Sequence, residues 1–194
     1  MGTVLMQIYT IDDFRRMPWA NGGGMTCELF RLPHPARPEA FAMRFSVAEV
    51  ESGGPFSHFP GIDRHLGLLD GGGMALERDD GGHLLLDGLG QVVSFAGEIG
   101  VQCRLLAGPL RDCNLMLARD WGRGELARLA PAHGETVRLA AADVALLYLQ
   151  RGEWTRDGQA LPSGGLLLLE NEAASLLAGR GAVAWRATVR RVRA

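Results

Sequence analysis

Two short apolar runs flank a glycine-rich turn in the segment His65-Leu66-Gly67-Leu68-Leu69-Asp70-Gly71-Gly72-Gly73-Met74-Ala75-Leu76-Glu77-Arg78. Short apolar runs that end at glycine, proline or aspartate are typical of β-strands. Consecutive glycines after an aspartate supply the backbone freedom that a tight turn between two strands requires. The segment therefore predicts a strand, a turn and a second strand.

The same rhythm continues along most of the chain, and no segment shows three turns of helical periodicity. A short helix is expected only over Ile11–Arg16, capped by Thr10 or Asp12. Many short strands with regular turns predict an all-β sandwich or barrel with very little helix. The further expected strands are Val4–Tyr9, Met25–Leu32, Phe41–Val50, Leu84–Asp87, Val92–Ala96, Val101–Leu106, Asn114–Ala118, Thr136–Leu139, Val144–Gln150, Leu166–Glu170, Ala173–Leu177 and Ala182–Val189.

The C-terminal third repeats the earlier pattern in reduced form. The run Val144–Leu149 resembles Leu66–Leu69, and the run Gly164–Leu169 resembles Gly90–Phe95. Such repetition indicates a duplicated β-barrel whose second copy lacks polar residues. We therefore expect two barrels that pack as one compact unit: residues 1–130, with a ligand site, and a degenerate copy over residues 131–194.

The composition excludes several classes of function. All 20 basic residues are arginine. A chain without lysine forms no Schiff base with pyridoxal phosphate and has no phosphate loop ending in Gly-Lys. The formal net charge of −2 provides no overall basic field for a nucleic acid. Apolar runs stay far below the roughly 18 residues of a membrane span, and Met1–Thr10 lacks the pattern of a secretory signal.

The cysteines indicate the cellular compartment. Cys27, Cys103 and Cys113 form no Cys-x-x-Cys pair and are too few for a disulfide framework. We expect them to be reduced and mostly buried, as in a cytoplasmic protein. The sequence therefore predicts a cytoplasmic protein with no nucleic-acid partner and no membrane partner, for which a homodimer is plausible through exposed sheet edges.

One expected strand carries polar residues on a single face. In Phe41–Val47 the aromatic and aliphatic side chains alternate with Arg44 and Ser46. If the packed layer lies outside a barrel, Arg44 and Ser46 point into the lumen. The alternative is that they face water.

Metal ligands and nucleophiles are poorly represented. None of the histidines has His-x-His or His-x-x-x-His spacing or stands beside a cysteine at ligand spacing. His58 and His65 are close enough to meet around a turn, but a solvated histidine is the more common case. Neither Ser46 nor Ser57 lies in a Gly-x-Ser-x-Gly motif, and Cys103 reads as an inert buried thiol. The five histidines are His34, His58, His65, His83 and His133.

Two glycine-rich loops carry more information. In the first, Asn21-Gly22-Gly23-Gly24 allows bare N–H groups to approach an anion, and Pro18-Trp19 provides a stiff anchor. The second, Gly53–His65, is aromatic and turn-rich and includes an Asp-Arg pair. Loops of this content on a β scaffold often carry the site.

Six motifs occur in order between Pro18 and Met116, within a resemblance that covers about residues 7–118. They are Pro18-Trp19-x-Asn21-Gly22-Gly23-Gly24-x-Thr26, Arg44-x-Ser46-x-Ala48, Gly54-Pro55-Phe56-Ser57-x-Phe59-Pro60-Gly61-x-Asp63-Arg64, Phe95-x-Gly97, Cys103-Arg104-Leu105 and Gly108-Pro109-x-Arg111-Asp112-x-Asn114-Leu115-Met116. The set resembles the HutD/Ves family, and Cys113, where the family usually has an aromatic residue, is a departure. The resemblance implies a cupin-like double β-barrel (bicupin). It also implies an association with bacterial histidine utilisation for HutD members and with stress or cold response for Ves members, without an agreed catalytic activity.

The resemblance also allows a comparison with the metal site of cupin enzymes, which use His-x-His, a glutamate and a later histidine. When this metal motif is aligned with the chain, its first two histidines correspond to Ser57 and Phe59 and its glutamate to Arg64. Its later histidine falls near Gly100. A fixed cation at the position of the metal charge repels a divalent ion and attracts an anion. We therefore expect no metal and no cofactor.

The predicted occupant is a small carboxylate. Arg64 and Arg44 can each bind one through paired hydrogen bonds, and Arg104 is a third candidate. Asp63 is expected to hold Arg64 in place, or to form only a surface salt bridge. Trp19, Phe56 and Phe59 are expected to cover the planar part of a ligand, unless they are ordinary core. The expected ligand-binding residues are Trp19, Asn21, Arg44, Ser46, Phe56, Ser57, Phe59, Asp63, Arg64 and Arg104.

The sequence thus predicts a metal-free protein that binds an anionic metabolite resembling urocanate or formylglutamate and has a regulatory or accessory role in histidine utilisation. One alternative is a metal-independent isomerase or hydrolase that acts on a small carboxylate through Asp63 or His58 and is favoured if His58 or Glu98 points into the pocket. A second alternative is a stress-related interaction module. It would use Arg180–Ala194, which has five arginines and no acid, although the edge of a sheet protected by charge explains this run as well.

Overall fold

The computed structural model describes residues 6–193, which fold into β-strands joined by turns and loops, with one 3-10 turn. This confirms the all-β prediction. The expected helix is a single 3-10 turn, η1 (Ile11–Asp13), because Arg15 already pairs in the first strand of the next sheet. The first expected strand begins at Val4, which lies outside the described residues. No helix in residues 6–193 has the length and apolar character needed to cross a membrane.

The strands divide into two compact units. The large unit is Arg15–Arg123, and the C-terminal unit consists of residues 6–14 and 124–193. This division differs from the expected boundary at residue 130. Strands β1 (Gln7–Tyr9) and β12 (Gly122–Leu129) both belong to a sheet of the C-terminal unit. A strand belongs to the sheet whose backbone groups it bonds, and sequence spacing alone does not reveal that pairing.

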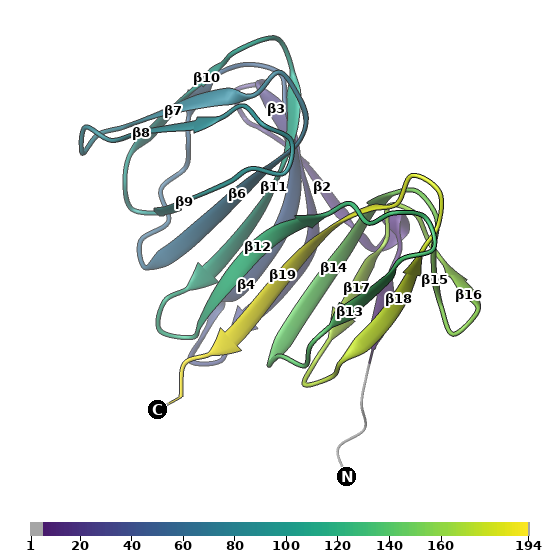
Figure 1. Cartoon of the computed structure of the whole chain (residues 1–194). Helices are drawn as coiled ribbons and strands as arrows, with labels where there is room; N and C mark the ends of the chain where they lie inside the picture. Colours follow the sequence, from purple (N-terminus) through teal and green to yellow (C-terminus); the bar gives the residue numbers. More distant parts are fainter. Residues whose placement is uncertain (1–5, 194) are drawn as a thin grey trace. The chain divides into compact units, whose positions relative to one another are not determined.

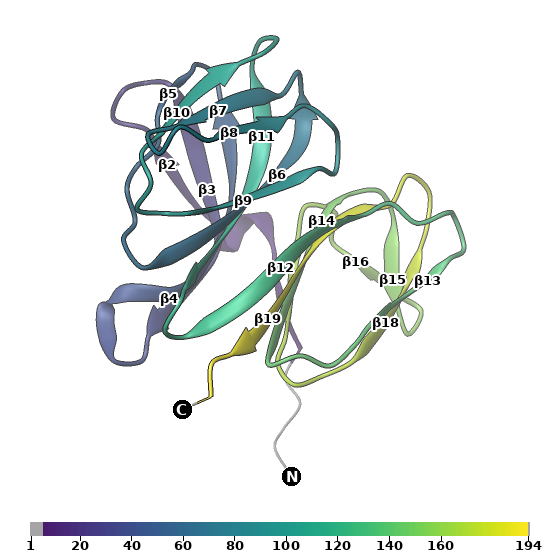
Figure 2. The ribbon, with the colours of Figure 1, turned by 60° about the vertical axis from the view of Figure 1, so that its left-hand side comes forward.

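The large unit consists of two antiparallel sheets (Figure 1). The six-stranded sheet has the order β2 (Arg15–Pro18), β3 (Gly24–His34), β4 (Arg37–Val50), β11 (Leu110–Ala118), β6 (Ile62–Gly71) and β9 (Val92–Ala96). The four-stranded sheet has the order β5 (Gly54–Pro55), β10 (Val101–Leu105), β7 (Met74–Arg78) and β8 (His83–Leu86). Figure 2 shows β7, β8 and β10 lying together as the second sheet.

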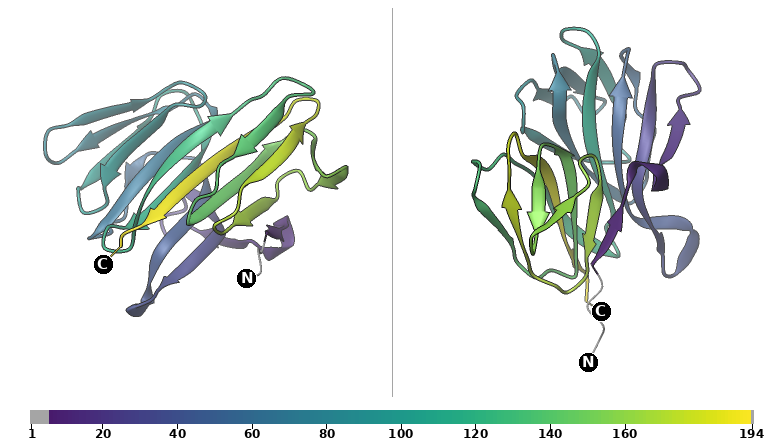
Figure 3. Two further views of the ribbon diagram at one scale, coloured as in Figure 1. Left: turned by 60° about the horizontal axis from the view of Figure 1, so that its bottom comes forward. Right: turned by 90° about the vertical axis from the view of Figure 1, so that its right-hand side faces the viewer.

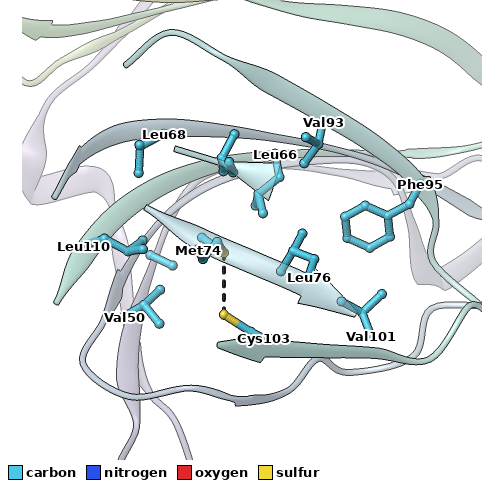
Figure 4. Close-up of a cluster of buried hydrophobic side chains, with 12 residues drawn as sticks. Val50, Leu66, Leu68, Met74, Leu76, Val93, Phe95, Val101, Cys103 and Leu110 are labelled. Carbon is cyan, nitrogen blue, oxygen red and sulfur yellow. Dashed lines mark hydrogen bonds between the residues drawn. The ribbon is translucent and has the colours of Figure 1, made fainter. Parts of the chain in front are cut away.

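An apolar core lies between these two sheets. Leu66 and Leu68 of β6 and Leu110 of β11 meet Met74 of β7 and Cys103 of β10 (Figure 4). Alternate residues of each strand face this core, as expected for paired sheets with one packed face each. The Cys103 thiol lies 3.6 Å from the Met74 sulfur, which is consistent with the prediction of a buried, reduced cysteine.

The glycine turn between β6 and β7 is formed as predicted. Gly71 and Gly73 have φ angles of 95° and 86°, in the region that favours glycine. A Cβ atom at Gly72 would lie 2.5 Å from the carbonyl oxygen of Ala107. The turn therefore requires glycine both for its backbone conformation and for its close approach to the neighbouring loop.

The C-terminal unit also has two antiparallel sheets around an apolar core. The five-stranded sheet has the order β1, β17 (Leu166–Leu169), β14 (Val144–Arg151), β19 (Val183–Arg191) and β12. The four-stranded sheet has the order β13 (Thr136–Leu139), β18 (Ala174–Ala178), β15 (Trp154–Arg156) and β16 (Gln159–Leu161). In Figure 3 the yellow β19 lies between its neighbours in the larger sheet.

The strand order of the large unit is repeated in the C-terminal unit. The order β4-β11-β6-β9 corresponds to β12-β19-β14-β17, and β5-β10-β7-β8 corresponds to β13-β18-β15-β16. The interiors differ. When the turn glycines Gly71 and Gly152 are aligned, Arg64 corresponds to Ala145, which is part of an apolar cluster. The duplicated pattern in the sequence therefore corresponds to a repeated topology in which the second copy has an apolar interior.

The arginine-rich C-terminal run does not form a sheet edge, so that expectation is wrong. β19 is hydrogen-bonded between β14 and β12, and Trp185 is fully buried with its Nε1 donating to Gln150 at 3.0 Å. The apolar residues that alternate along this strand pack into the core, which makes it an internal strand. Its tryptophan is therefore not available to a partner.

Candidate functional site

One cavity of about 410 Å³ in the large unit collects most of the buried polar side chains. The buried polar residues of the described chain are His34, Ser46, Arg64, Asp112 and Asn114, and the last four line this cavity. Buried polar groups require partners, so their convergence around an open space marks a candidate site. We call this cavity the arginine pocket.

Strand register places the polar side chains on one face of the six-stranded sheet. Ser46 of β4 is paired with Asn114 of β11. Two residues along, Met116 of β11 is paired with Arg44 on one side and Arg64 on the other. Residues two apart on a strand share a face. Arg44 and Ser46 therefore point into a cavity of the large unit and not into the surrounding water.

Arg64 is the dominant electrostatic feature of the pocket. Its side chain is 6% exposed, and its guanidinium carbon lies 4.8 Å from the ring centre of Phe56, 5.8 Å from Phe59 and 5.1 Å from Phe95. Its Nε atom is buried without a hydrogen-bond partner among the described residues. Burial lowers the pKa of Arg64 to about 10, so the group still carries its charge at neutral pH. The pocket thus contains a cation whose immediate neighbours are aromatic rings.

Asp112 lies in the same pocket and is 2% exposed. It is paired with Ala48 of β4 and Leu68 of β6, beside a β-bulge between Arg111 and Asp112. Burial raises its pKa to about 7, and the positive charge of Arg64 limits that rise. No ion pair within 4.0 Å joins Asp112 to Arg64 in residues 6–193. The carboxyl group therefore titrates near neutral pH within reach of the arginine's field.

Arg44 also lines the pocket, but its charge is balanced. Its Nε donates to Glu28 Oε2 at 2.6 Å, and both side chains are largely buried. Its Nη1 lies 3.9 Å from the sulfur of Met116. A neutralised guanidinium is a weaker anion receptor, so Arg64 and Arg44 have different roles in the pocket.

Two predicted site residues lie outside the pocket. Asp63 does not hold Arg64, because consecutive residues of β6 point to opposite faces of the sheet. Its carboxylate instead accepts a 2.6 Å bond from Arg119 Nε. Arg104 lies on the exposed side of β10. The arginine pocket is lined by the other eight predicted residues, which are Trp19, Asn21, Arg44, Ser46, Phe56, Ser57, Phe59 and Arg64.

In the first glycine loop two of the N–H groups bond within the loop itself. Gly22 N–H donates to the Trp19 carbonyl, and Gly23 N–H donates to the Asn21 side chain, both at 3.0 Å. Trp19 Nε1 donates to Thr26 at 2.8 Å, which fixes the indole at the pocket wall. The predicted anchor is therefore present, and the N–H groups of Gly22 and Gly23 are already bonded within the loop.

The second loop brings its aromatic residues to the pocket by backbone contacts with other strands. Phe56 N–H donates to the carbonyl of Val101 at 2.8 Å, and Phe59 N–H donates to that of Gly97 at 2.7 Å. Phe56 and Trp19 also pack against the apolar core. These two side chains therefore pack against the core and also line the pocket.

The donor set does not fit the metal centre of a cupin enzyme. No histidine is among the described residues that line the arginine pocket, and Asp112 is its single carboxylate. Cys103 lines it, but burial and the charge of Asp112 raise its thiol pKa to about 11, which disfavours the thiolate. His58 lines a separate cavity with Arg31 and Arg119.

Two polar residues that line the pocket, Asp112 and Asn114, are not among the residues predicted from the sequence. Both belong to the motif Gly108–Met116. A usable signal was present, because Asp112 and Asn114 are two residues apart inside the otherwise apolar strand Leu110–Ala118. Polar residues with period two in a buried strand indicate a polar patch on one face.

Comparison with known sequences identifies close relatives. The sequence model of the HutD family matches residues 11–185. An uncharacterised protein from the hutC 3′ region of Pseudomonas putida is 35% identical over 150 residues, which are 74% of this chain and 73% of that protein. Protein Ves of Citrobacter koseri is 38% identical over 113 residues, 56% of this chain and 57% of that protein.

Solved structures agree with these relationships. A conserved protein of unknown function from Pseudomonas aeruginosa has a TM-score of 0.82 at 30% identity, covering 96% of this chain and 99% of that one. HutD from Pseudomonas fluorescens has a TM-score of 0.79 at 26% identity, covering 97% and 100%. Pirin YhhW from Escherichia coli, solved with nickel(II), has a TM-score of 0.72 at 14% identity, covering 97% and 100%, which supports the cupin-like fold alone.

Proposed function

This chain belongs to the HutD family, and we propose that it binds a small carboxylate in the arginine pocket without a metal ion. In this proposal the protein is a sensor or carrier with a regulatory or accessory role in histidine utilisation, the process with which the family is associated. Urocanate and formylglutamate, acidic intermediates of histidine breakdown, are the ligands that this association suggests.

The observation that carries the proposal is the unpaired charge of Arg64. Burying an ion without a partner costs on the order of several kcal/mol, even after relaxation. Three aromatic rings offset part of that cost through cation–π attraction, roughly 0.5–2 kcal/mol each. A carboxylate would supply the missing countercharge, and the planar guanidinium fork suits it geometrically.

The dimensions and lining of the pocket support a ligand of metabolite size. Its volume of about 410 Å³ lies within the range of roughly 300–1,000 Å³ that is usual for small-molecule sites. Trp19 and Phe56 provide apolar walls, and a few buried polar groups provide orientation. This combination is the usual composition of a specific small-molecule pocket.

Calorimetric titration with urocanate and formylglutamate at pH 8 tests the proposal. We expect at least one to bind the wild type, and Arg64→Ala to weaken that binding at least about tenfold, since a charged hydrogen bond contributes about 1.5–3 kcal/mol. Arg104→Ala is the matched control, because this arginine is exposed and outside the pocket. Equal affinity in the wild type and Arg64→Ala, or no binding by either ligand, would count against the proposal.

A second candidate function, a metal-independent enzyme, is favoured by one observation. Neither expected acid or base lines the arginine pocket, since His58 lines another cavity and Asp63 accepts from Arg119. Glu98 also binds Arg119 and does not line the pocket. Asp112, however, is a buried carboxyl group with a pKa of about 7 inside the pocket. A group of that pKa suits general acid–base catalysis. Product formation from urocanate or formylglutamate, followed by NMR and lost in Asp112→Asn, would support an enzyme, whereas unchanged ligand after long incubation would exclude this activity.

A further inference from the structure

The arginine pocket contains two buried groups of opposite charge that are not joined by an ion pair. Arg64 of β6 is 6% exposed, Asp112 of β11 is 2% exposed, and both line the cavity. Asp112 is the only carboxylate among the described residues that line it. Arg44, the other cation of the lining, is neutralised by Glu28 at 2.6 Å. When Asp112 is ionised, the charges of the ligand-free pocket therefore balance.

A bound carboxylate disturbs this balance. It adds a negative charge to a cavity that already holds an ionised Asp112, and only Arg64 is left to compensate both. Like charges that share a buried site disfavour each other's ionised form, and a nearby charge shifts a pKa by about 1–3 units. If Asp112 takes up a proton from the solvent, the pocket with one bound carboxylate is neutral again. A second carboxylate on the ligand would strengthen this effect.

Asp112 lies near enough to Arg64 for the electrostatic effect to be mutual. In the pairing of β11 with β6, Asp112 is opposite Leu68 and Met116 is opposite Arg64, so the two charged side chains share one face of the sheet. The charge of each shifts the pKa of the other. Because no ion pair within 4.0 Å joins Asp112 to Arg64 in residues 6–193, Asp112 can gain or lose a proton without breaking one.

The titratable groups around Asp112 determine whether its proton can be followed separately. These groups are Arg64 of β6, Arg44 of β4 with its partner Glu28 of β3, Cys103 of β10, and Cys113 beside Asp112 on β11. Burial raises the thiol pKa of Cys103 to about 11 and that of Cys113 well above its ordinary value, so both thiols stay protonated. The pKa of Arg64, about 10, keeps its charge, whereas that of Asp112 is about 7.

We propose that carboxylate binding in the arginine pocket is coupled to the uptake of a proton by Asp112, an inference that rests on the proposed function. Above neutral pH in the ligand-free protein, ionised Asp112 balances the charge of Arg64. A ligand carboxylate on Arg64 takes over this role, and Asp112 becomes protonated. Its O–H group can then donate to an oxygen in the same cavity. The affinity of the pocket therefore decreases as the pH rises, which makes the site sensitive to pH.

Isothermal titration calorimetry with formylglutamate tests the coupling. Carboxylates ordinarily titrate below about pH 5, so this ligand keeps its charge between pH 6 and pH 8.5, whereas the imidazole ring of urocanate titrates close to this range. Titrations at pH 7.5 in HEPES and in Tris, which differ in ionisation enthalpy, give the number of protons taken up per ligand bound. The dissociation constant is then measured from pH 6 to pH 8.5.

We expect the wild type to take up about half a proton or more per ligand at pH 7.5. Its dissociation constant should rise about fivefold or more between pH 6 and pH 8.5, because Asp112 is mostly protonated in both states at pH 6 and in the complex alone at higher pH. Asp112→Asn should remove both effects, because an amide does not titrate in this range. Asp87→Asn, at an exposed aspartate outside the pocket, should retain them.

Carbon-13 NMR of the wild type follows the carboxyl resonance of Asp112 directly. Its titration midpoint should move from about pH 7 to a higher value when formylglutamate is bound, by about one pH unit or more. This measurement identifies the group even if Asp112→Asn fails to fold, and an unchanged midpoint would contradict the coupling.

The outcomes that overturn the inference are distinct from those that overturn the proposed function. Binding without proton uptake at pH 7.5, with the affinity lowered in Arg64→Ala, would overturn the coupling and leave carboxylate binding intact. Proton uptake that persists in a folded Asp112→Asn variant would overturn the assignment to Asp112. Failure of both formylglutamate and urocanate to bind the wild type at pH 6 would overturn both proposals.

Discussion

Arg64 and Asp112 are buried in the same cavity, yet they do not form an ion pair. They lie on neighbouring strands, where Asp112 is paired with Leu68 and Arg64 with Met116. The register thus sets them four residues apart along the paired strands, on the same face. Each charge influences the pKa of the other although no ion pair joins them.

The titration of Asp112 should make folding stability depend on pH. Its pKa is about 7 in the folded protein, compared with an ordinary value of 3.8, because it is buried. A raised pKa means that the folded state binds the proton more tightly, so the stabilisation is complete below about pH 4 and is lost as the pH rises to about 7. Arg64, Cys103 and Cys113 interact with the group, and both thiols stay protonated in this range because burial raises their pKa values.

Asp112→Asn tests this dependence. As the pH rises from 5 to 8, the wild type should lose about 2 kcal/mol or more of unfolding free energy relative to Asp112→Asn. The slope of this loss should reach about 1.4 kcal/mol per pH unit. Urea unfolding of both proteins at the two pH values measures this difference. If the free energies of unfolding of the two proteins changed equally between pH 5 and pH 8, that result would contradict the raised pKa of Asp112.

Two arginines of the same pocket should respond oppositely to the same substitution. Arg64→Met removes a buried charge that has no carboxylate in contact, so at pH 6 the ligand-free variant should be as stable as the wild type or about 1 kcal/mol more stable. Arg44→Met leaves the Glu28 carboxylate largely buried and unpaired, and should destabilise the fold by about 3 kcal/mol. Chemical denaturation without ligand measures both, and a larger loss for Arg64→Met than for Arg44→Met would refute this assignment of charges.

Carboxylate binding should not depend on a metal ion. The pocket combines an unpaired arginine with a single carboxylate and, among its described lining residues, no imidazole. We expect elemental analysis of the purified protein to show no stoichiometric transition metal, and EDTA to leave the affinity for urocanate unchanged. Stoichiometric zinc, iron or nickel that is required for binding would invalidate the interpretation of Arg64 as the receptor.

The glycine loop should be sensitive at one position. A Cβ atom at Gly24 would lie 2.3 Å from the Glu49 carbonyl oxygen and 3.1 Å from the Trp19 ring. Gly24→Ala should therefore destabilise the protein by about 2 kcal/mol or more and displace the indole. Gly54→Ala is the control, because its Cβ would meet only Asn21, at an ordinary 3.9 Å. Thermal unfolding and tryptophan fluorescence report the two effects, and equal behaviour of both variants would exclude the steric explanation.

The alternation of Phe41–Val47 predicted correctly that Arg44 and Ser46 share a face, because the pleat of a strand fixes that relation locally. The same rule, applied to Asp63 and Arg64, would have shown that they cannot act together on one face. Which face encloses a cavity depends on the second sheet, and the partner of Arg44 depends on which strand lies beside β4. Glu28 reaches it only because β3 pairs there.

The sequence by itself determined the strands, the glycine turns and the repeated pattern, since each depends on residues a few positions apart. The placement of Arg64 at a metal-ligand position of cupin enzymes is implied by the resemblance and stays a prediction. The tertiary structure decided which charges are balanced, because Asp63 bonds to Arg119 and Arg44 to Glu28, whereas Arg64 is left among aromatic rings. Charge balance and burial depend on groups that are distant in the chain and adjacent only after folding, and so the acceptors Asp112 and Asn114 became apparent only in the folded protein.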